Sequence, residues 1–332
     1  MKRLFFALLL LLALALLAAG GAAAWAWHWW RAPLPLAQEQ VELTIEPGTP
    51  VRTVVRNWIE AGVQTDERLL FLAFRVSGEA QRIRAGSFVL ETGDSAERLL
   101  AKMVRGEEVL ETVRLIEGWT FAQARTALAQ APGLRQTISG LSDAEIMQRL
   151  GHPGLPAEGR FFPDTYRYGR GVSDLALLRQ AHEALQRELA AAWAVRSKPQ
   201  VLKSPEELLI LASIVEKETG LESDRALVAG VFANRLRVGM RLQTDPTVIY
   251  GLGSRFDGNL RKVDLLTDTP FNSYTRAGLP PTPIALPGRN SLRAAALPAN
   301  TRALYFVARG DGSSVFSETL DAHNRAVNQY QR

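Results

Sequence analysis

The chain has 332 residues, 47% of them hydrophobic and 22% charged, which allows two modest domains beside a targeting segment. Its net charge of +5 suits an anionic membrane or polymer surface, but no run of Lys and Arg interleaved with aromatic residues indicates nucleic acid. The absence of cysteine excludes disulfides and thiolate metal sites, and the four histidines are too scattered for a metal site. We therefore expect neither a metal nor another cofactor.

The N-terminus carries an uncharged Leu/Ala-rich stretch, residues 4–27, which is long enough to cross a bilayer as a helix. Lys2 and Arg3 precede it, so the positive-inside tendency places the N-terminus in the cytoplasm and the remainder outside. Tryptophans at its far end predict an aromatic belt at the outer interface: Trp25, Trp27, Trp29 and Trp30. The alternative is a cleaved signal peptide, because residues 22–24 are three alanines. The apolar run exceeds a typical signal-peptide core, so we predict that residues 1–30 form a cytoplasmic tip and an uncleaved anchor.

Residues 31–40 include Pro33 and Pro35 and are predicted to form a short stiff linker. Residues 41–106 then form a small α+β module with elements in the order strand, helix, helix, strand. The elements are predicted at residues 41–45, 51–61, 66–77 and 85–90, with a further helix after Ser95 that ends near Arg105. This order looks like a LysM-like module, a type that binds glycan chains. A plain spacer is the alternative, and the pattern does not separate the two.

Residues 107–332 are predicted to form a mixed, mainly helical domain. A strand at residues 109–116 and a turn lead into helices that continue to about residue 194. Residues 158–166 interrupt them with glycine, proline and aromatic side chains, which predicts a specific, packed loop. Such a loop either carries function or is a structural clasp.

A helix over residues 205–219 is the centre of this domain. Ser204 and Pro205 suit its N-cap and first position, and Gly220 suits a left-handed residue after its end. Its apolar composition predicts a buried helix. Of the two glutamates at its C-terminal end, Glu218 lies at the end of an apolar stripe, where desolvation would raise its pKa towards that of a general acid. The alternative is that Glu216 and Glu218 are both solvated.

Two loops after this helix are rich in polar and aromatic residues. A helix is predicted at residues 222–236 and is followed by a loop at residues 239–251, in which Gln243, Thr244 and Asp245 supply hydrogen-bond donors and acceptors. Residues 271–284 form the second loop. A strand near residues 303–307, a turn and a helix near residues 317–329 complete the chain.

Residues 212–219, 234–251 and 271–274 resemble the endolytic lytic transglycosylases of murein (MltG, YceG-like), as do residues 158–166 and 304–307. The resemblance covers nearly the whole chain, anchor included. It implies a single-pass inner-membrane protein whose periplasmic domain cleaves nascent peptidoglycan between N-acetylmuramic acid and N-acetylglucosamine. The products would carry 1,6-anhydro ends, and strand elongation would end there.

The same resemblance implies that Glu218 is the catalytic residue, with no cofactor. Glu218 would protonate the glycosidic oxygen and then accept a proton from the muramyl C6 hydroxyl, which attacks C1. The motif positions suggest that six residues line the glycan groove: Gln243, Thr244, Asp245, Tyr250, Asn272 and Tyr274. For each of them, the alternative of merely holding a loop stays open. The implied partners are peptidoglycan strands and the peptidoglycan synthases (penicillin-binding proteins).

Two other functions compete with this reading. A glycoside hydrolase would use Asp245 or Glu222 as a second carboxylate. A membrane-anchored peptidoglycan-binding scaffold would use Glu218 only to end its helix. The predicted fold is the same in each case: α+β, with a transmembrane helix, a LysM-like module and a mainly helical domain.

Overall fold

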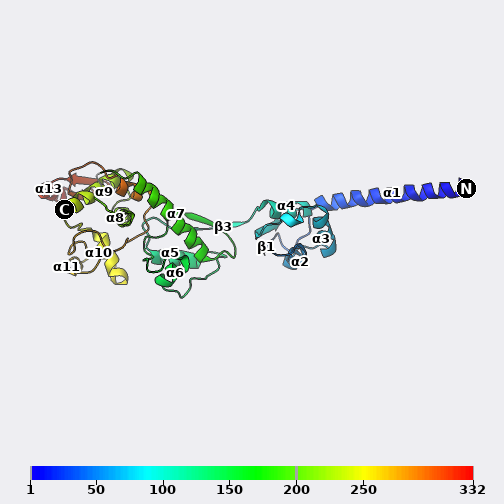
Figure 1. Ribbon diagram of the computed structural model, residues 1–332, viewed down its shortest axis with the longest axis horizontal. Helices are drawn as coiled ribbons and strands as arrows, with labels where there is room; N and C mark the ends of the chain where they lie inside the picture. The colour runs from blue at the N-terminus through cyan, green and yellow to red at the C-terminus, as the bar shows by residue number, and fades with distance from the viewer. Residues whose placement is uncertain (1, 199–200, 332) are drawn as a thin grey trace. The chain divides into compact units, whose positions relative to one another are not determined.

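The computed structural model describes residues 2–198 and 201–331. The chain divides into two compact units, one formed by Met1–Glu111 with Tyr168–Gly171 and the other by Thr112–Arg167 with Val172–Arg332. Helices occur together with small two-stranded sheets, which confirms the predicted α+β class (Figure 1).

The first unit contains the N-terminal helix and a small α+β module. Its elements are α1 (Lys2–Arg31), β1 (Gln40–Ile45), α2 (Val51–Ala61), α3 (Glu67–Val76), a 3-10 turn (Ala80–Arg82), β2 (Gly86–Glu91) and α4 (Ala96–Arg105). Strands β1 and β2 pair antiparallel, with Val41 opposite Leu90, and both of these side chains are buried. Large side chains from the helices and β2 complete the core, among them Trp58, Phe74 and Phe88.

Helix α1 fits a single-pass membrane anchor. Its segment Leu8–Arg31 has a mean hydropathy of 2.3, and none of it is buried in the protein. Exposed apolar side chains over such a length are stable in a bilayer and not in water. The end of the helix packs on the module. The rings of Trp30 and Phe74 meet edge to face with 6.2 Å between their centroids, and the Arg31 guanidinium lies 3.3 Å from the Glu97 carboxylate.

The segment after α1 is attached to the module rather than free. Leu34 is buried and its N–H donates to the Asp94 carbonyl at 2.8 Å. The carbonyl of Pro35 accepts from the Gln64 N–H at 2.8 Å, and the Ala37 N–H donates to Gly62 at 2.9 Å. Residues 31–40, which were predicted to form a short stiff linker, are therefore fixed to the module by these contacts.

The second unit is mainly helical. Two strands, β3 (Leu110–Arg114) and β4 (Thr165–Gly169), have residues in the ranges of both units. The other elements of the second unit are α5 (Phe121–Gln130), α6 (Asp143–Leu150), α7 (Asp174–Ala194), α8 (Pro205–Glu218), α9 (Glu222–Arg237), α10 (Asp245–Leu252), a 3-10 turn (Gly253–Arg255), α11 (Lys262–Leu266), α12 (Arg289–Ala296), β5 (Tyr305–Ala308), β6 (Ser314–Ser317) and α13 (Leu320–Tyr330). Strands β3 and β4 pair, and β5 and β6 form an antiparallel hairpin. The largest core is built around α8, which packs against α7, α9 and α12.

Two elements lie where the sequence predicted loops. Strand β4 overlaps residues 158–166; it alternates buried Tyr166 and Tyr168 with exposed Thr165 and Arg167, but over too few residues to be distinctive. Helix α10 occupies residues that were predicted to form a loop. It was not predicted because it has only eight residues and includes β-branched side chains, which have modest helix propensity.

Candidate active site

Helix α8 forms because its sequence satisfies its own N-terminus and buries its centre. Ser204 accepts a hydrogen bond from the Glu207 N–H at 3.2 Å, and Pro205 occupies the first turn. The Glu207 carboxylate reaches back to the Lys203 N–H at 2.6 Å, one residue before the N-cap. Residues 208–215 are all buried, as the apolar composition predicted.

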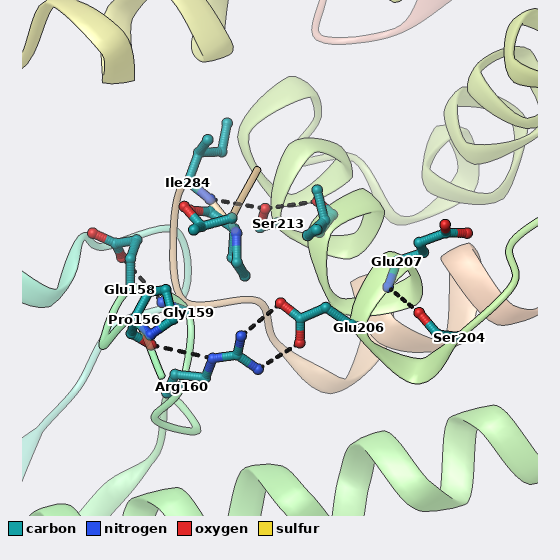
Figure 2. A network of polar contacts seen from close by, with 12 residues as sticks. Pro156, Glu158, Gly159, Arg160, Ser204, Glu206, Glu207, Ser213 and Ile284 are labelled. Atoms are coloured by element: carbon teal, nitrogen blue, oxygen red, sulfur yellow. Dashed lines mark hydrogen bonds and ion pairs between the residues drawn. The ribbon is translucent and has the colours of Figure 1, made fainter. Parts of the chain in front are cut away.

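A polar network holds α8 to the loop that follows α6 (Figure 2). The buried Arg160 guanidinium forms a two-pronged pair with the Glu206 carboxylate, at 2.7 and 2.5 Å. In the middle of the helix, Ser213 donates to the Ile210 carbonyl and accepts from the Ile284 N–H at 3.0 Å. Bidentate Arg–carboxylate geometry fixes orientation as well as distance. The loop of residues 158–166 therefore contributes a structural clasp at the start of α8.

The end of α8 differs from the expected left-handed cap. Thr219 is the C-cap and has an extended backbone, with φ −146° and ψ 132°. Its hydroxyl accepts from the Leu221 N–H at 3.0 Å, so a side chain turns the chain where Gly220 was expected to do so. The consequence is a sharp end directly after Glu218.

Glu216 is buried and paired, which corrects the view of it as a solvated helix-end residue. Its carboxylate lies 3.3 Å from the Arg225 guanidinium, and the two side chains are 7% and 8% exposed. It also accepts from the Gly288 N–H at 2.8 Å. Through Arg225 and Gly288, the Glu216 carboxylate connects α8 with α9 and with the start of α12.

Glu218, on the other face of α8, borders an open cavity of about 600 Å³. The Thr244 hydroxyl donates a hydrogen bond to its carboxylate. Burial raises the pKa of Glu218 to about 6, with the negative charge of Asp245 adding to the shift and the Thr244 hydrogen bond and Arg235 opposing it. The sequence-based expectation of a raised pKa at this position therefore agrees with the surroundings of the side chain.

Four of the predicted groove residues line the same cavity as Glu218: Gln243, Thr244, Asp245 and Tyr274. Tyr274 donates its hydroxyl hydrogen to the Asp245 carboxylate at 2.6 Å, and burial raises the pKa of Tyr274. Gln243 has φ +47°, the one positive value for a non-glycine residue within residues 2–198 and 201–331. Such a backbone conformation is uncommon and often marks a functional site.

The segment around Gln243 is held by the second polar loop. The Gln243 N–H donates to the Ser273 carbonyl at 3.1 Å, and the Thr244 N–H donates to the Ser273 hydroxyl at 3.0 Å. Thr244 is buried, and its side chain does not cap α10. Its hydroxyl is thereby free to bind Glu218.

Two predicted groove residues, Asn272 and Tyr250, are not among the residues that line the Glu218 cavity. Asn272 is fully buried, and its amide donates to the Asp264, Leu265 and Thr267 carbonyls at 2.7 to 3.2 Å. These bonds occupy its donors, so Asn272 holds the loop instead of meeting a ligand. Tyr250 borders a different cavity together with Glu158.

The cavity also contains residues that the sequence analysis did not select. Arg235 is 7% exposed and donates to the Leu304 carbonyl at 2.6 Å and the Leu242 carbonyl at 2.5 Å. Tyr305 from β5 and His323 from α13 stack at 5.3 Å and line the same cavity. Arg235 stands in the segment that carries the resemblance, so its position was a usable signal. Nothing in the tail sequence indicates that α13 reaches the site.

A partly buried carboxyl with a raised pKa, set in an open cavity lined by polar side chains, is typical of enzymes that work by general acid–base catalysis. The chain belongs to the YceG-like family, whose family model matches residues 43–329. The predicted family membership is thereby confirmed.

Named relatives extend over most of the chain. A Bacillus subtilis protein named endolytic murein transglycosylase is 31% identical over 312 residues, which cover 87% of this chain and 84% of that protein. A Streptococcus pneumoniae D39 protein of the same name is 26% identical, and the match covers 89% of this chain and 59% of the longer relative. The crystal structure of a yceG-like protein from Listeria monocytogenes matches with a TM-score of 0.53 and 27% identity, over 86% of this chain and 98% of that one.

Proposed function

We infer that this chain is an endolytic murein transglycosylase, a lyase that cleaves the glycosidic bond between N-acetylmuramic acid and N-acetylglucosamine and leaves 1,6-anhydro ends. Two relatives that match more than four fifths of the chain carry that enzyme name. The observation that supports the chemistry is the position of Glu218, a carboxyl protonated below about pH 6 at the edge of a polar cavity. This activity is favoured over a scaffold without catalysis.

We propose that Glu218 is the acid and the base of the reaction. Its carboxyl donates a proton to the glycosidic oxygen as the bond from that oxygen to the muramyl C1 breaks. The muramyl C6 hydroxyl forms the new bond to C1, and its proton passes to the ionised Glu218. The attack is intramolecular, so orientation replaces an activated water molecule. The Thr244 hydroxyl holds the carboxylate in place throughout.

The other charged groups of the cavity have supporting roles in this proposal. Asp245 raises the pKa of Glu218 and is itself held by the Tyr274 hydroxyl. Arg235 favours the ionised form of Glu218, which is the product of the first proton transfer. Gln243 presents an exposed amide that suits sugar hydroxyl or acetamido groups.

Product analysis separates this mechanism from hydrolysis. Asp245 borders the cavity and is the candidate for the second carboxylate of a hydrolase, whereas Glu222 contacts Asn290 and Arg225 and is not among the residues that line it. Glycan strands digested with the wild-type protein and with Glu218→Gln are compared by mass spectrometry. Ends lacking one water molecule support transglycosylation, while hydrated ends would establish a hydrolase and overturn the proposal.

For the remaining parts of the chain we propose an arrangement in four segments. Residues 1–30 form the cytoplasmic tip and inner-membrane anchor, residues 31–40 the connection, residues 41–106 a LysM-like glycan-binding module and residues 107–332 the periplasmic catalytic domain. Peptidoglycan synthases would act alongside it. N-terminal sequencing of the membrane-extracted protein tests the anchor, and a mature start near Trp25 would contradict it.

The role of the module is tested by removing it. A truncated protein that begins at Glu107 and is shown to be folded by circular dichroism should still produce 1,6-anhydro ends, with weaker binding to long strands. The strand–helix–helix–strand order of β1, α2, α3 and β2 supports this assignment. Full affinity for long strands in the truncated protein would show that residues 41–106 are only a spacer.

A further inference from the structure

The second unit contains another cavity, of about 300 Å³, and Glu218 is not among the residues that line it. Three segments that are distant in the sequence meet there: Glu158 from the loop after α6, Tyr250 from α10 and Thr282 from the loop before α12. Asp143 and Ala144 at the start of α6 form another side. Ligand sites in proteins commonly combine a concave, largely apolar wall with a few polar groups in this way.

Glu158 is the central polar group of this cavity. Its carboxylate accepts from the Phe121 N–H at 3.0 Å and from the Gly159 N–H at 3.2 Å, and it is hydrogen-bonded to the Tyr250 hydroxyl. The Tyr250 ring is held in turn by an edge-to-face contact with Phe271 at 4.8 Å. Both side chains are therefore oriented before any ligand arrives.

The charges of the cavity indicate a neutral ligand. Asp143 is paired with Arg125 at 2.7 Å, so its negative charge is compensated. Burial raises the pKa of Glu158 to about 7, so a large fraction of this carboxyl is protonated near neutrality. A cation would find little uncompensated negative charge, whereas a ligand with hydroxyl or amide groups can exchange hydrogen bonds with a carboxyl and a phenol. Leu155 and Pro156 add an apolar wall.

We propose that the Glu158–Tyr250 cavity is a second carbohydrate subsite, which binds an N-acetylhexosamine of the same glycan strand at a distance from the bond that Glu218 cleaves. This inference rests on the proposed function. An endolytic cut requires the strand to continue on both sides of the scissile bond. Helix α10 links the two cavities. Asp245 at its start lines the cavity of Glu218, and Tyr250 lines the cavity of Glu158. The two residues are five positions apart, which is about 7.5 Å along the helix axis.

The subsite is tested with chitohexaose, a neutral N-acetylglucosamine oligomer that contains no N-acetylmuramic acid and therefore no bond of the type that the proposed reaction cleaves. Its dissociation constant for the full chain in detergent is measured by isothermal titration calorimetry. Ala144→Phe fills the cavity from an exposed position on α6. The matched control is Gln148→Phe, exposed on the same helix and not among the residues that line the cavity. We expect Ala144→Phe to weaken binding at least fivefold and Gln148→Phe to leave it unchanged.

A second variant, Tyr250→Phe, removes only the hydroxyl group and keeps the ring that contacts Phe271. The loss of one hydrogen bond to a sugar should weaken chitohexaose binding about fivefold. No binding by the wild-type protein, or equal dissociation constants for Ala144→Phe and Gln148→Phe, would overturn the subsite. Failure of the proposed function has a separate readout, the absence of 1,6-anhydro ends, which chitohexaose binding does not measure.

Discussion

Glu216 and Glu218 are separated by one residue on α8 and have opposite surroundings. The Glu216 carboxylate is 3.3 Å from the Arg225 guanidinium and accepts from the Gly288 N–H, so its charge is compensated inside the protein. The Glu218 carboxylate accepts from the Thr244 hydroxyl and borders a cavity, where burial raises its pKa. A helix turns 100° per residue, so this spacing suffices to place one acid inside the structure and the other at the edge of the cavity.

Glu218→Gln is expected to remove activity while keeping the fold. The amide cannot donate the proton that the reaction needs, so the cleavage rate should fall by about two to four powers of ten. Release of 1,6-anhydro products, followed by liquid chromatography and mass spectrometry, measures this fall. Substantial cleavage by a correctly folded Glu218→Gln protein would remove Glu218 from its role.

The same variant should be more stable than the wild type above pH 6. The pKa of Glu218 in the folded protein is about 6, against 4.5 for the free group, so the folded state binds more protons and loses stability as pH rises between these values. Replacing Glu218 by the neutral amide should recover up to about 2 kcal/mol at pH 7.5 and little at pH 4. Thermal unfolding at both pH values checks this, and an equal effect at the two would contradict it.

Glu216→Gln is expected to act on stability rather than on the chemical step. It leaves Arg225 buried without its closest carboxylate partner, which costs about 3 kcal/mol for a buried pair. The remaining folded protein should cleave with a normal basic limb in its pH profile. Denaturant unfolding gives the stability, and cleavage per folded molecule gives the activity. A loss of cleavage without a loss of stability would show that Glu216 participates directly.

Arg160→Lys should destabilise the protein although the charge is kept. The buried guanidinium binds Glu206 with two nitrogens and also reaches the Pro156 carbonyl, and an ammonium group cannot reproduce that fork (Figure 2). We expect a loss of about 1–3 kcal/mol in the free energy of unfolding. Arg289→Lys is the matched control, because Arg289 makes a similar two-pronged pair with Glu188 at a site where its side chain is 69% exposed. Its cost should stay below about 1 kcal/mol.

Local signals in the sequence predicted most of the helices. Asp66, Ser95, Thr120 and Ser204 each accept a backbone N–H at the start of a helix, as their residue types lead one to expect. Helix α10 was missed because it has only eight residues and includes β-branched side chains, although Thr244 at its N-cap and Pro246 in its first turn are helix-start signals.

The candidate site was predictable only where chemistry and position coincide. The apolar stripe of the helix favoured Glu218 only slightly over Glu216, and the resemblance to the murein transglycosylases selected Glu218, Thr244 and Asp245. Asn272 looks like a ligand-binding amide in sequence, and only its three carbonyl partners show that it holds a loop. His323 enters the cavity through tertiary packing of α13 on the hairpin of β5 and β6, which no local pattern specifies.

The pH dependence of cleavage should report the pKa of Glu218 through its basic limb. Activity requires the protonated carboxyl, so it should fall as pH rises through about 6. In Thr244→Val the hydrogen bond that favours the ionised form is lost, so the pKa of Glu218 rises and the basic limb moves to higher pH. A hydrogen bond to a charged group corresponds to a shift of about one pH unit.

The Thr244→Val substitution removes the hydroxyl group and leaves the backbone contacts of this residue in place. Valine has nearly the shape of threonine, and the Thr244 backbone N–H keeps its bond to the Ser273 hydroxyl at 3.0 Å. Thr275→Val serves as the control, because its hydroxyl binds Asp268 and it is not among the residues that line the Glu218 cavity. Its profile should match that of the wild type. A basic limb that stays in place or moves to lower pH in Thr244→Val would mean that Thr244 does not set the ionisation of the catalytic acid, and that burial, Asp245 and Arg235 control it.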